Sequence, residues 1–178
     1  EAMRTRGMGN TRGLPVTWRD GSAERTGLGN MSMRAVTFGS SFNVVDQRSA
    51  LRESRRIVQP DGWFCCLWNH RNLDDPLQAR IEQVIRQRIP DYDYGSRRED
   101  PTPVLTLSKL FGDVTSLAVD FEVRMTRQEA IEAWRSHATL ARQAGPAFAT
   151  LITAISELFT TEVVRVPYTT RAWYARFR

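Results

Sequence analysis

The sequence predicts a single domain of the α/β class. Two apolar, β-rich runs at residues 35–39 and 63–68 alternate with helical patterns at residues 49–58 and 76–89, which is typical of parallel strands joined by crossover helices. A length of 178 residues suits one domain. Hydrophobic residues make up 41% of the chain and charged residues 25%, as in ordinary globular proteins. No run approaches the ~18 apolar residues of a membrane helix, so we expect no membrane partner.

The first half of the chain is expected to hold, in order, a strand at 14–18, a strand at 35–39, a helix at 49–58 and a strand at 63–68. The Asp20-Gly21 pair predicts a turn after the first strand. The run at 35–39 shows no alternation of polar and apolar residues, which predicts burial of both its faces. Pro60 and Gly62 are expected to stop the helix before the third strand.

The second half is expected to hold a helix at 76–89, a strand at 117–125, helices at 126–142 and 148–159, and a last strand at 162–177 kinked at Pro167. Pro76 suits a first helical turn. Residues 91–103 are polar and charged, which predicts a surface loop. Thr126 and Glu129 have the spacing of a capping box. We expect residues 126–160 to form a helical insertion or cover within a single partial domain of residues 1–178.

Charge and cysteine usage exclude some classes of protein. The formal charge is +5, and Lys109 is the one lysine among 25 basic residues. The arginines are interleaved with acids, whereas a nucleic-acid binder usually gathers its basic residues into a stripe, so the pattern does not favour nucleic acid as a partner. Cys65 and Cys66 are adjacent, which disfavours a disulfide between them. Two cysteines in an apolar run indicate a buried strand and a reducing, cytoplasmic setting.

Three stretches in a fixed order carry a resemblance to a known family. Residues 21–28 read GSAERTGL, residues 36–42 read VTFGSSF, and residues 46–64 read DQRSALRESRRIVQPDGWF. They are similar to the loop after the third strand, the fourth strand with its turn, and the helix, turn and fifth strand of class I S-adenosylmethionine-dependent methyltransferases. Within that family the resemblance is to small-molecule enzymes of the methyltransferase type 11 kind.

The resemblance implies a Rossmann-like sheet with the strand order 3-2-1-4-5-7-6, of which this chain would hold strands 3–7. It also implies S-adenosyl-L-methionine as cofactor and a small-molecule acceptor. By the family's pattern, Ser22, Ala23 and Glu24 would lie along the adenine ring, and Gly39, Ser40 and Ser41 would pass the methionine end of the cofactor. Glu1 stands where an acidic residue would hold the ribose hydroxyls.

The sequence departs from the family at its start. The Gly-rich turn after strand one, together with strands one and two and the first helix, has no counterpart here, so we expect a truncated, processed or partial domain. An edge of strand four would then stay unpaired. We expect one of three repairs: strand three moves beside strand four, a second copy of the chain forms a homodimer through the edge, or a further segment covers it.

The acceptor side offers His70 as the candidate catalytic residue, a general base, because it follows the strand-five run, where α/β sheets place ligands. Asn69, Tyr92 and Tyr94 are the candidate acceptor-binding residues. Alternatives stay open: His70 caps a loop, and the tyrosines pack on their own loop. The histidines and acids show no metal-ligand spacing.

Two functions from different classes therefore follow. The first is methyl transfer to a small molecule by this chain or by an enzyme of which it is the C-terminal portion. The alternative is a non-catalytic, methyltransferase-like module that has lost cofactor binding and serves binding or dimerisation. A nucleic-acid modifier of the same fold is favoured only by the basic composition. The sequence does not name the acceptor, or whether O, N or C is methylated.

Overall fold

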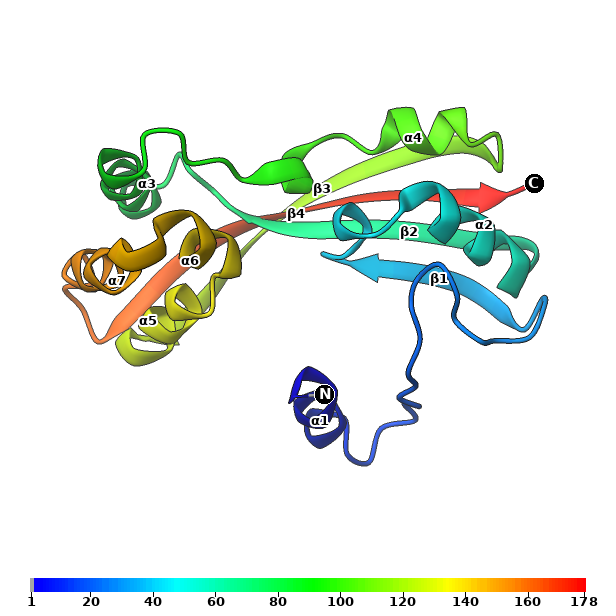
Figure 1. Cartoon of the computed structure of the whole chain (residues 1–178), viewed down its shortest axis with the longest axis horizontal. Helices are drawn as coiled ribbons and strands as arrows, with labels where there is room; N and C mark the ends of the chain where they lie inside the picture. Colours follow the sequence, from blue (N-terminus) through cyan, green and yellow to red (C-terminus); the bar gives the residue numbers. More distant parts are fainter. Residues whose placement is uncertain (1) are drawn as a thin grey trace.

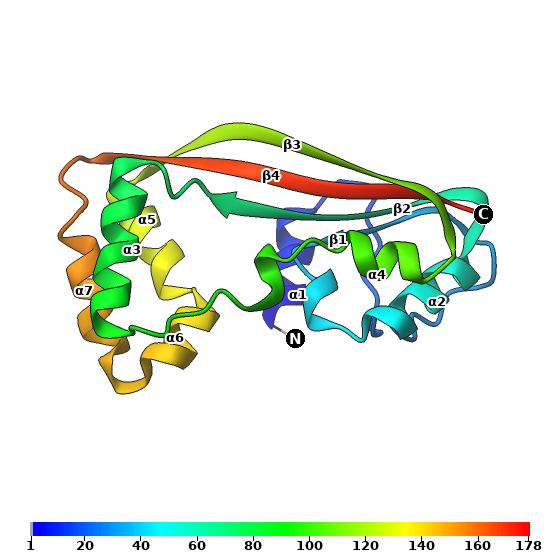
Figure 2. The same ribbon diagram turned by 90° about the horizontal axis from the view of Figure 1, so that it is seen from above.

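The computed structural model describes residues 2–178, with side chains described for residues 4–96 and 98–178. A four-stranded sheet has most of its helices along one side (Figures 1 and 2). The strands are β1 (Met33–Gly39), β2 (Val58–Arg71), β3 (Phe111–Thr126) and β4 (Val163–Phe177). The helices are α1 (Ala2–Asn10), α2 (Gln47–Ile57), α3 (Pro76–Arg88), α4 (Thr102–Leu107), α5 (Arg127–Arg135), α6 (Ala138–Ala144) and α7 (Phe148–Ser156), with 3-10 turns at η1 (Phe42–Val44), η2 (Gly95–Arg98) and η3 (Gly145–Ala147).

The strand order is β1-β2-β4-β3. β1 and β2 are parallel, and β4 runs antiparallel to both β2 and β3. In family numbering this is the order 4-5-7-6, which confirms the α/β prediction and the partial sheet. Because β1 and β2 are parallel, their carboxyl ends meet at one edge of the sheet, where α/β proteins bind ligands.

Local signals explain where α2 and β2 begin. The Asp46 carboxylate accepts a hydrogen bond from the Ser49 backbone N–H at 2.7 Å, so the helix starts two residues earlier than expected. The chain leads directly from α2 into β2 at Val58, and Gly62 lies where β2 passes beside β1. A Cβ at position 62 would lie 2.6 Å from the Arg34 carbonyl oxygen, so the close approach of β1 requires glycine.

Two hydrophobic cores lie under the sheet at opposite ends of the long β3–β4 ribbon. The sheet core packs α2 and α4 against β1, β2 and the end of β4, and it includes Phe38, Phe42, Leu51, Phe64, Leu105, Phe111 and Phe177. The helical core packs α3, α5, α6 and α7 against the start of β4, and it includes Ile81, Ile85, Trp134, Leu140, Leu151, Ile155 and Val166. Cys66 is buried in the sheet core and Cys65 is half-buried, and both thiols are free.

The expected strand at 14–18 is wrong. Residues 14–20 form no strand, because Trp18 packs on the N-terminal segment. Its indole N–H donates to the Thr11 hydroxyl at 2.9 Å, and its ring lies against Gly7 of α1. The first of the three repairs therefore does not occur. Within residues 2–178, β1 has β2 as its single neighbour.

Other boundaries also differ from expectation. β1 is not buried on both faces: Phe38 is buried and Met33 and Val36 are partly buried, while the other residues of the strand are exposed. The helix expected at 126–142 is two helices, since the His137 ring restarts the second by accepting a hydrogen bond from the Leu140 N–H at 3.2 Å. The surface loop expected at 91–103 contains η2 and leads into α4. β4 runs through Pro167, which pairs with Glu122.

The face of the sheet opposite α2 and α4 carries no helix among the described residues (Figure 2). Its side chains include Trp63, Leu117, Val119 and Phe121, which are all exposed. No helix within residues 2–178 is long and apolar enough to cross a membrane.

Candidate functional site

A cavity of about 190 Å³ opens beside the carboxyl end of β2. Asn69, His70 and Arg71 form one side of it as the last residues of the strand. The other walls come from α3, the loop after it, the α5–α6 junction and β4, and they include Gln78, Ile81, Glu82, Tyr94, Arg98, Trp134, His137 and Tyr168. The helical segment expected as a cover thus supplies one wall of the cavity.

Glu82 and Tyr94 form a fixed polar pair in the cavity wall. The Tyr94 hydroxyl donates a short hydrogen bond to the Glu82 carboxylate, which also accepts one from the Arg86 guanidinium at 2.7 Å. Burial, followed by the bond to Glu82, raises the pKa of Tyr94 well above its usual value. Tyr94 therefore stays a neutral hydrogen-bond donor at physiological pH.

Two arginines line the cavity, and each lies over an aromatic ring. The Arg71 guanidinium lies 4.0 Å from the centre of the Trp134 ring, and the Arg98 guanidinium lies 4.4 Å from the centre of the Tyr94 ring. Both distances fall within the range of favourable cation–π contacts. The Trp134 ring in turn stacks on the His137 ring, with centroids 5.6 Å apart and planes inclined by 14°.

A second, more polar hollow of about 390 Å³ adjoins the cavity and shares His70, Arg71 and Arg98 with it. It is also lined by Asp74, Asp120, Thr169 and Arg171. The Asp120 carboxylate accepts a 2.5 Å hydrogen bond from the Thr169 hydroxyl. Imidazole, guanidinium and carboxylate groups thus converge around the end of β2, a setting suited to proton transfer and to anion binding. Among the described residues, no cluster of three or more His, Cys, Asp or Glu could hold a metal ion.

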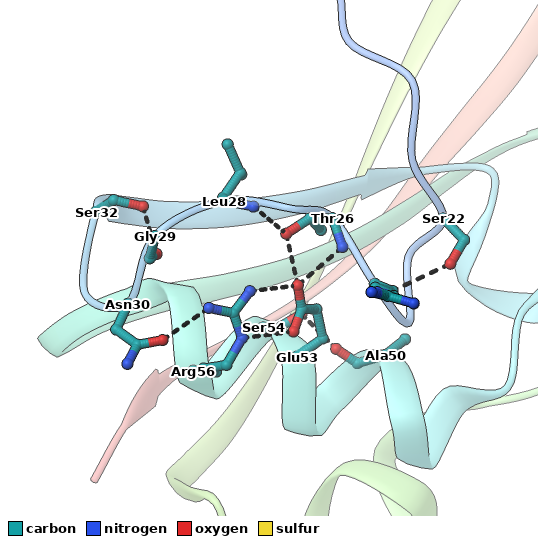
Figure 3. Close-up of polar contacts among 11 residues, drawn as sticks. Ser22, Thr26, Leu28, Gly29, Asn30, Ser32, Ala50, Glu53, Ser54 and Arg56 are labelled. Carbon is teal, nitrogen blue, oxygen red and sulfur yellow. Dashed lines mark hydrogen bonds and ion pairs between the residues drawn. The ribbon is translucent and has the colours of Figure 1, made fainter.

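The loop at residues 20–32 is held to α2 by a buried glutamate (Figure 3). Glu53 Oε1 accepts from the Thr26 N–H at 2.8 Å and the Thr26 hydroxyl at 2.6 Å, while both of its oxygens accept from Arg56 at 2.7 Å. Arg56 also donates to Asn30 at 2.7 Å. The bonds from Arg56, and then those from Thr26, lower the pKa of Glu53 to about 2. The network fixes the loop that includes the adenine-facing candidates.

Ser22, Ala23 and Glu24 lie in a tight turn at the start of this loop, where Ser22 and Arg25 pair. Ala23 packs against the sheet core. Glu24 Oε1 accepts from the Asp46 N–H at 3.0 Å, which ties the turn to the start of α2. Hydrogen bonds from its own backbone, from Ser22 and from Asp46 lower the pKa of Glu24.

Gly39, Ser40 and Ser41 lie where β1 ends. Ser40 adopts a positive φ of 55°, and its N–H donates to the Leu67 carbonyl at 2.8 Å, which holds this turn beside β2 three residues before His70. A Cβ at Gly39 would meet nothing within 4 Å, so open space lies over the strand end. The open space at Gly39 leaves room for a ligand at this strand end. Glu1 lies outside the described residues. No Gly-rich turn of the family's kind occurs in residues 1–178.

The structure brings together three acceptor-side candidates, Asn69, His70 and Tyr94. Tyr92 does not line the cavity: it is buried in the helical core and packs edge-on against Tyr94 at 5.1 Å. Sequence reasoning missed Arg71, Glu82, Arg98, Trp134 and His137 as cavity residues. No sequence spacing could have found them, because they come from four separate segments that meet only in the folded chain.

The first part of the chain is similar to known methyltransferases. Residues 1–66 match the family model of a methyltransferase domain. The ubiquinone/menaquinone biosynthesis C-methyltransferase UbiE of Caulobacter vibrioides (strain NA1000 / CB15N) is 41% identical over 77 residues, which are 42% of this chain and 30% of that protein. The enzyme of the same name from Caulobacter sp. (strain K31) is 33% identical over 79 residues, or 43% and 31% of the two chains. The match thus spans less than a third of these curated relatives.

The fold agrees over nearly the whole chain. A candidate type II methyltransferase from Anaeromyxobacter dehalogenans superposes with a TM-score of 0.65, covering 92% of this chain and 72% of that one at 17% identity. The family model covers β1, α2 and most of β2, and the structural likeness extends to the cavity-forming half. Residues 1–66 of this chain thus match a methyltransferase domain, and the chain as a whole has a Rossmann-like methyltransferase fold.

Proposed function

We propose that this chain binds a small-molecule acceptor in the cavity at the carboxyl end of β2 and positions it for methylation by S-adenosylmethionine. The observation that carries the proposal is the placement of the cavity. His70 stands at the end of β2, and the turn of Ser40 is bonded to Leu67 on the same strand at the same sheet edge. The donor-side turn and the acceptor cavity therefore share one edge of the sheet.

When bound, S-adenosylmethionine supplies an electrophilic methyl group. The chain's own residues contribute position and proton transfer. The turn at Ser22–Glu24 would hold the adenine ring, and Gly39–Ser41 would leave room for the methionine end. Holding donor and acceptor in line is the largest contribution that such a site makes. His70 would take the proton that the acceptor loses, which contributes about 10²–10⁴-fold in rate where a base is needed.

The test is a calorimetric titration of the chain with S-adenosylmethionine, using matched glycine variants. Gly39→Val adds a side chain to open space at the donor turn and should weaken binding about tenfold or more, because the side chain would occupy the room of the cofactor. Gly112→Val is the control, since a Cβ there also meets nothing within 4 Å but lies in β3, far from the turn. Equal binding by both variants and the parent chain would contradict the proposed cofactor position.

The unpaired edge of β1 favours a second candidate, a dimerising module. Within residues 2–178 the outer edge of β1 has no strand beside it, and exposed edges of this kind readily pair with another chain. Light scattering coupled to size exclusion would report the mass of the chain in solution. A stable dimer that does not bind S-adenosylmethionine would support the module, whereas a monomer that binds it would exclude the module.

A further inference from the structure

The two arginines of the cavity each lie over an aromatic ring, and neither has a carboxylate partner among the residues whose side chains are described. Arg71 lies over Trp134 and Arg98 lies over Tyr94, and one Arg98 nitrogen donates to the Arg71 carbonyl at 3.4 Å. Among the residues whose side chains are described, neither guanidinium takes part in an ion pair. A guanidinium has five N–H donors, so the pair retains donors that a ligand could use.

The acids near the cavity are already engaged by other groups. Glu82 is bonded to Arg86 and Tyr94, and Asp120 accepts from the Thr169 hydroxyl. Asp74 lines only the adjoining hollow. Arg171 also lines only that hollow. Among the described residues that line the cavity itself, two arginines stand against one carboxylate, that of Glu82, so the balance of charge there is positive.

We infer that the acceptor carries an anionic group, a carboxylate or a phosphate, which Arg71 and Arg98 bind beside His70. This inference rests on the proposed function, because it assigns a chemical class to the acceptor of that site. The planar fork of arginine matches both anions through paired N–H donors. Stacking on Trp134 and Tyr94 fixes both forks before the ligand arrives, which reduces the entropy lost on binding.

The position of the anion also orients the rest of the acceptor. Arg71 directly follows His70, so an anionic group bound at Arg71 places the neighbouring atoms of the acceptor near the imidazole. The adjoining hollow leaves room for the remainder of the molecule. A neutral acceptor would leave the guanidinium donors without a partner in a partly desolvated site, which costs affinity.

The test uses three small probes that share a phenyl ring: benzoate, phenyl phosphate and the neutral benzamide. Each is titrated into the full chain without cofactor, and binding is followed by the amide shifts of residues 69–71 and the indole signal of Trp134. At least one anion should bind about tenfold or more tightly than benzamide. The tighter anion identifies whether the acceptor group is a carboxylate or a phosphate.

Variants locate the effect. Arg71→Gln and Arg98→Gln should each weaken anion binding about tenfold, while Arg80→Gln, an exposed arginine on α3 outside both hollows, should leave binding unchanged. If Arg71→Gln fails to fold, Arg98→Lys keeps the charge but removes the planar fork, and it should bind less tightly than the parent and more tightly than Arg98→Gln. Far-UV circular dichroism checks the fold of each variant.

Equal affinity for benzoate, phenyl phosphate and benzamide would overturn the inference, as would anion binding that survives both Arg→Gln changes. Saturation of the same residues by a single-stranded RNA, with a steep loss of affinity in salt and no binding of the small anions, would also overturn it. The two proposals can be contradicted separately. Anion binding without S-adenosylmethionine binding would contradict the proposed function. Cofactor binding without a preference for anions would contradict only this inference.

Discussion

The two hydrophobic cores differ in how the chain assembles them. The sheet core is built around the buried ring of Phe64, whose neighbours are Phe38, Phe42, Phe111 and Phe177 at centroid distances of 5.6, 5.3, 5.4 and 6.5 Å. The helical core has no such centre. It joins aliphatic stripes of four short helices, of which α6 has only seven residues, to the far end of the β3–β4 ribbon.

This difference separates the two halves of the proposed site. The sheet core supports β1, α2 and β2, which carry the cofactor-side turn and the family match. The helical core supports Trp134 and the α5–α6 junction, which form a wall of the acceptor cavity. A chain arranged in this way can change its acceptor wall while the cofactor side stays intact.

The largest effect is expected for Phe64→Ala. Removing a fully buried ring from the centre of the sheet core should cost about 3–5 kcal/mol in the free energy of unfolding, through lost burial and the cavity left behind. Phe121→Ala is the matched control, because its ring is 38% exposed and lies outside the sheet core, stacked on Tyr168. Urea denaturation followed by circular dichroism measures both. A loss for Phe64→Ala no larger than for Phe121→Ala would contradict the central role of this ring.

Leu151→Ala tests whether the two cores are independent. Leu151 is fully buried in the helical core, so its truncation should cost about 2–5 kcal/mol. If the cores are separate, the variant should lose anion binding at Arg71 and Arg98 while still binding S-adenosylmethionine. Near-UV circular dichroism and the two titrations measure this. Loss of binding to both ligands would show that the two cores unfold as one unit.

The sequence predicted the elements that depend on local signals better than those that depend on distant contacts. The signals for α2 and β2 are local, since Asp46 caps the helix and Gly62 permits the close turn, and each lies within a few residues of what it controls. The capping box of α5 was likewise predicted and is confirmed. The expected strand at 14–18 failed because Trp18 found a partner in α1, a contact that no periodicity reveals.

The residues that line the proposed acceptor cavity were still harder to predict from the sequence. Asn69, His70 and Tyr94 were found because they lie just beyond a recognisable strand or in a tyrosine-bearing loop. Trp134 meets Arg71 only through the twist of the β3–β4 ribbon and the packing of α5, and the two are distant in the sequence. Contacts of this kind depend on the whole fold, so composition and spacing could not predict them.

A smaller, pH-dependent effect is expected at Glu53, which ties the loop at residues 20–32 to the sheet core. Folding lowers the pKa of Glu53 from 4.5 to about 2, so its stabilisation is present above about pH 4.5 and is lost as the pH falls toward 2. At neutral pH, Glu53→Gln should lower the free energy of unfolding by roughly 2 kcal/mol. The pKa shift alone would suggest more, but Arg56 is partly exposed, so solvent screens the ion pair. Stability curves between pH 7 and pH 2 should converge for the parent and the variant.

The control for that series is Glu99→Gln, an exposed glutamate outside the network, for which the difference from the parent should be near zero at every pH. A constant difference between the parent and Glu53→Gln down to pH 2 would contradict the ion pair as the source of the stability. In that event Glu53 would act through its hydrogen bonds to Thr26 alone, and the loop would be independent of the charge of Arg56.

The smallest effect is expected at the start of α5, where the helical core depends on a cap. The Thr126 hydroxyl accepts from the Glu129 N–H at 3.2 Å, and the Glu129 carboxylate accepts from the Thr126 N–H at 2.7 Å. Thr126→Ala should therefore cost about 1 kcal/mol in the free energy of unfolding. Thr161→Ala, a change at an exposed threonine outside the capping box, is the control.

Because a nine-residue helix is marginal by itself, Thr126→Ala should also raise the rate of hydrogen exchange in α5 without affecting α2. Equal exchange in both helices would show that the cap does not act locally, and that the two ends of the molecule are coupled more closely than their separate cores indicate.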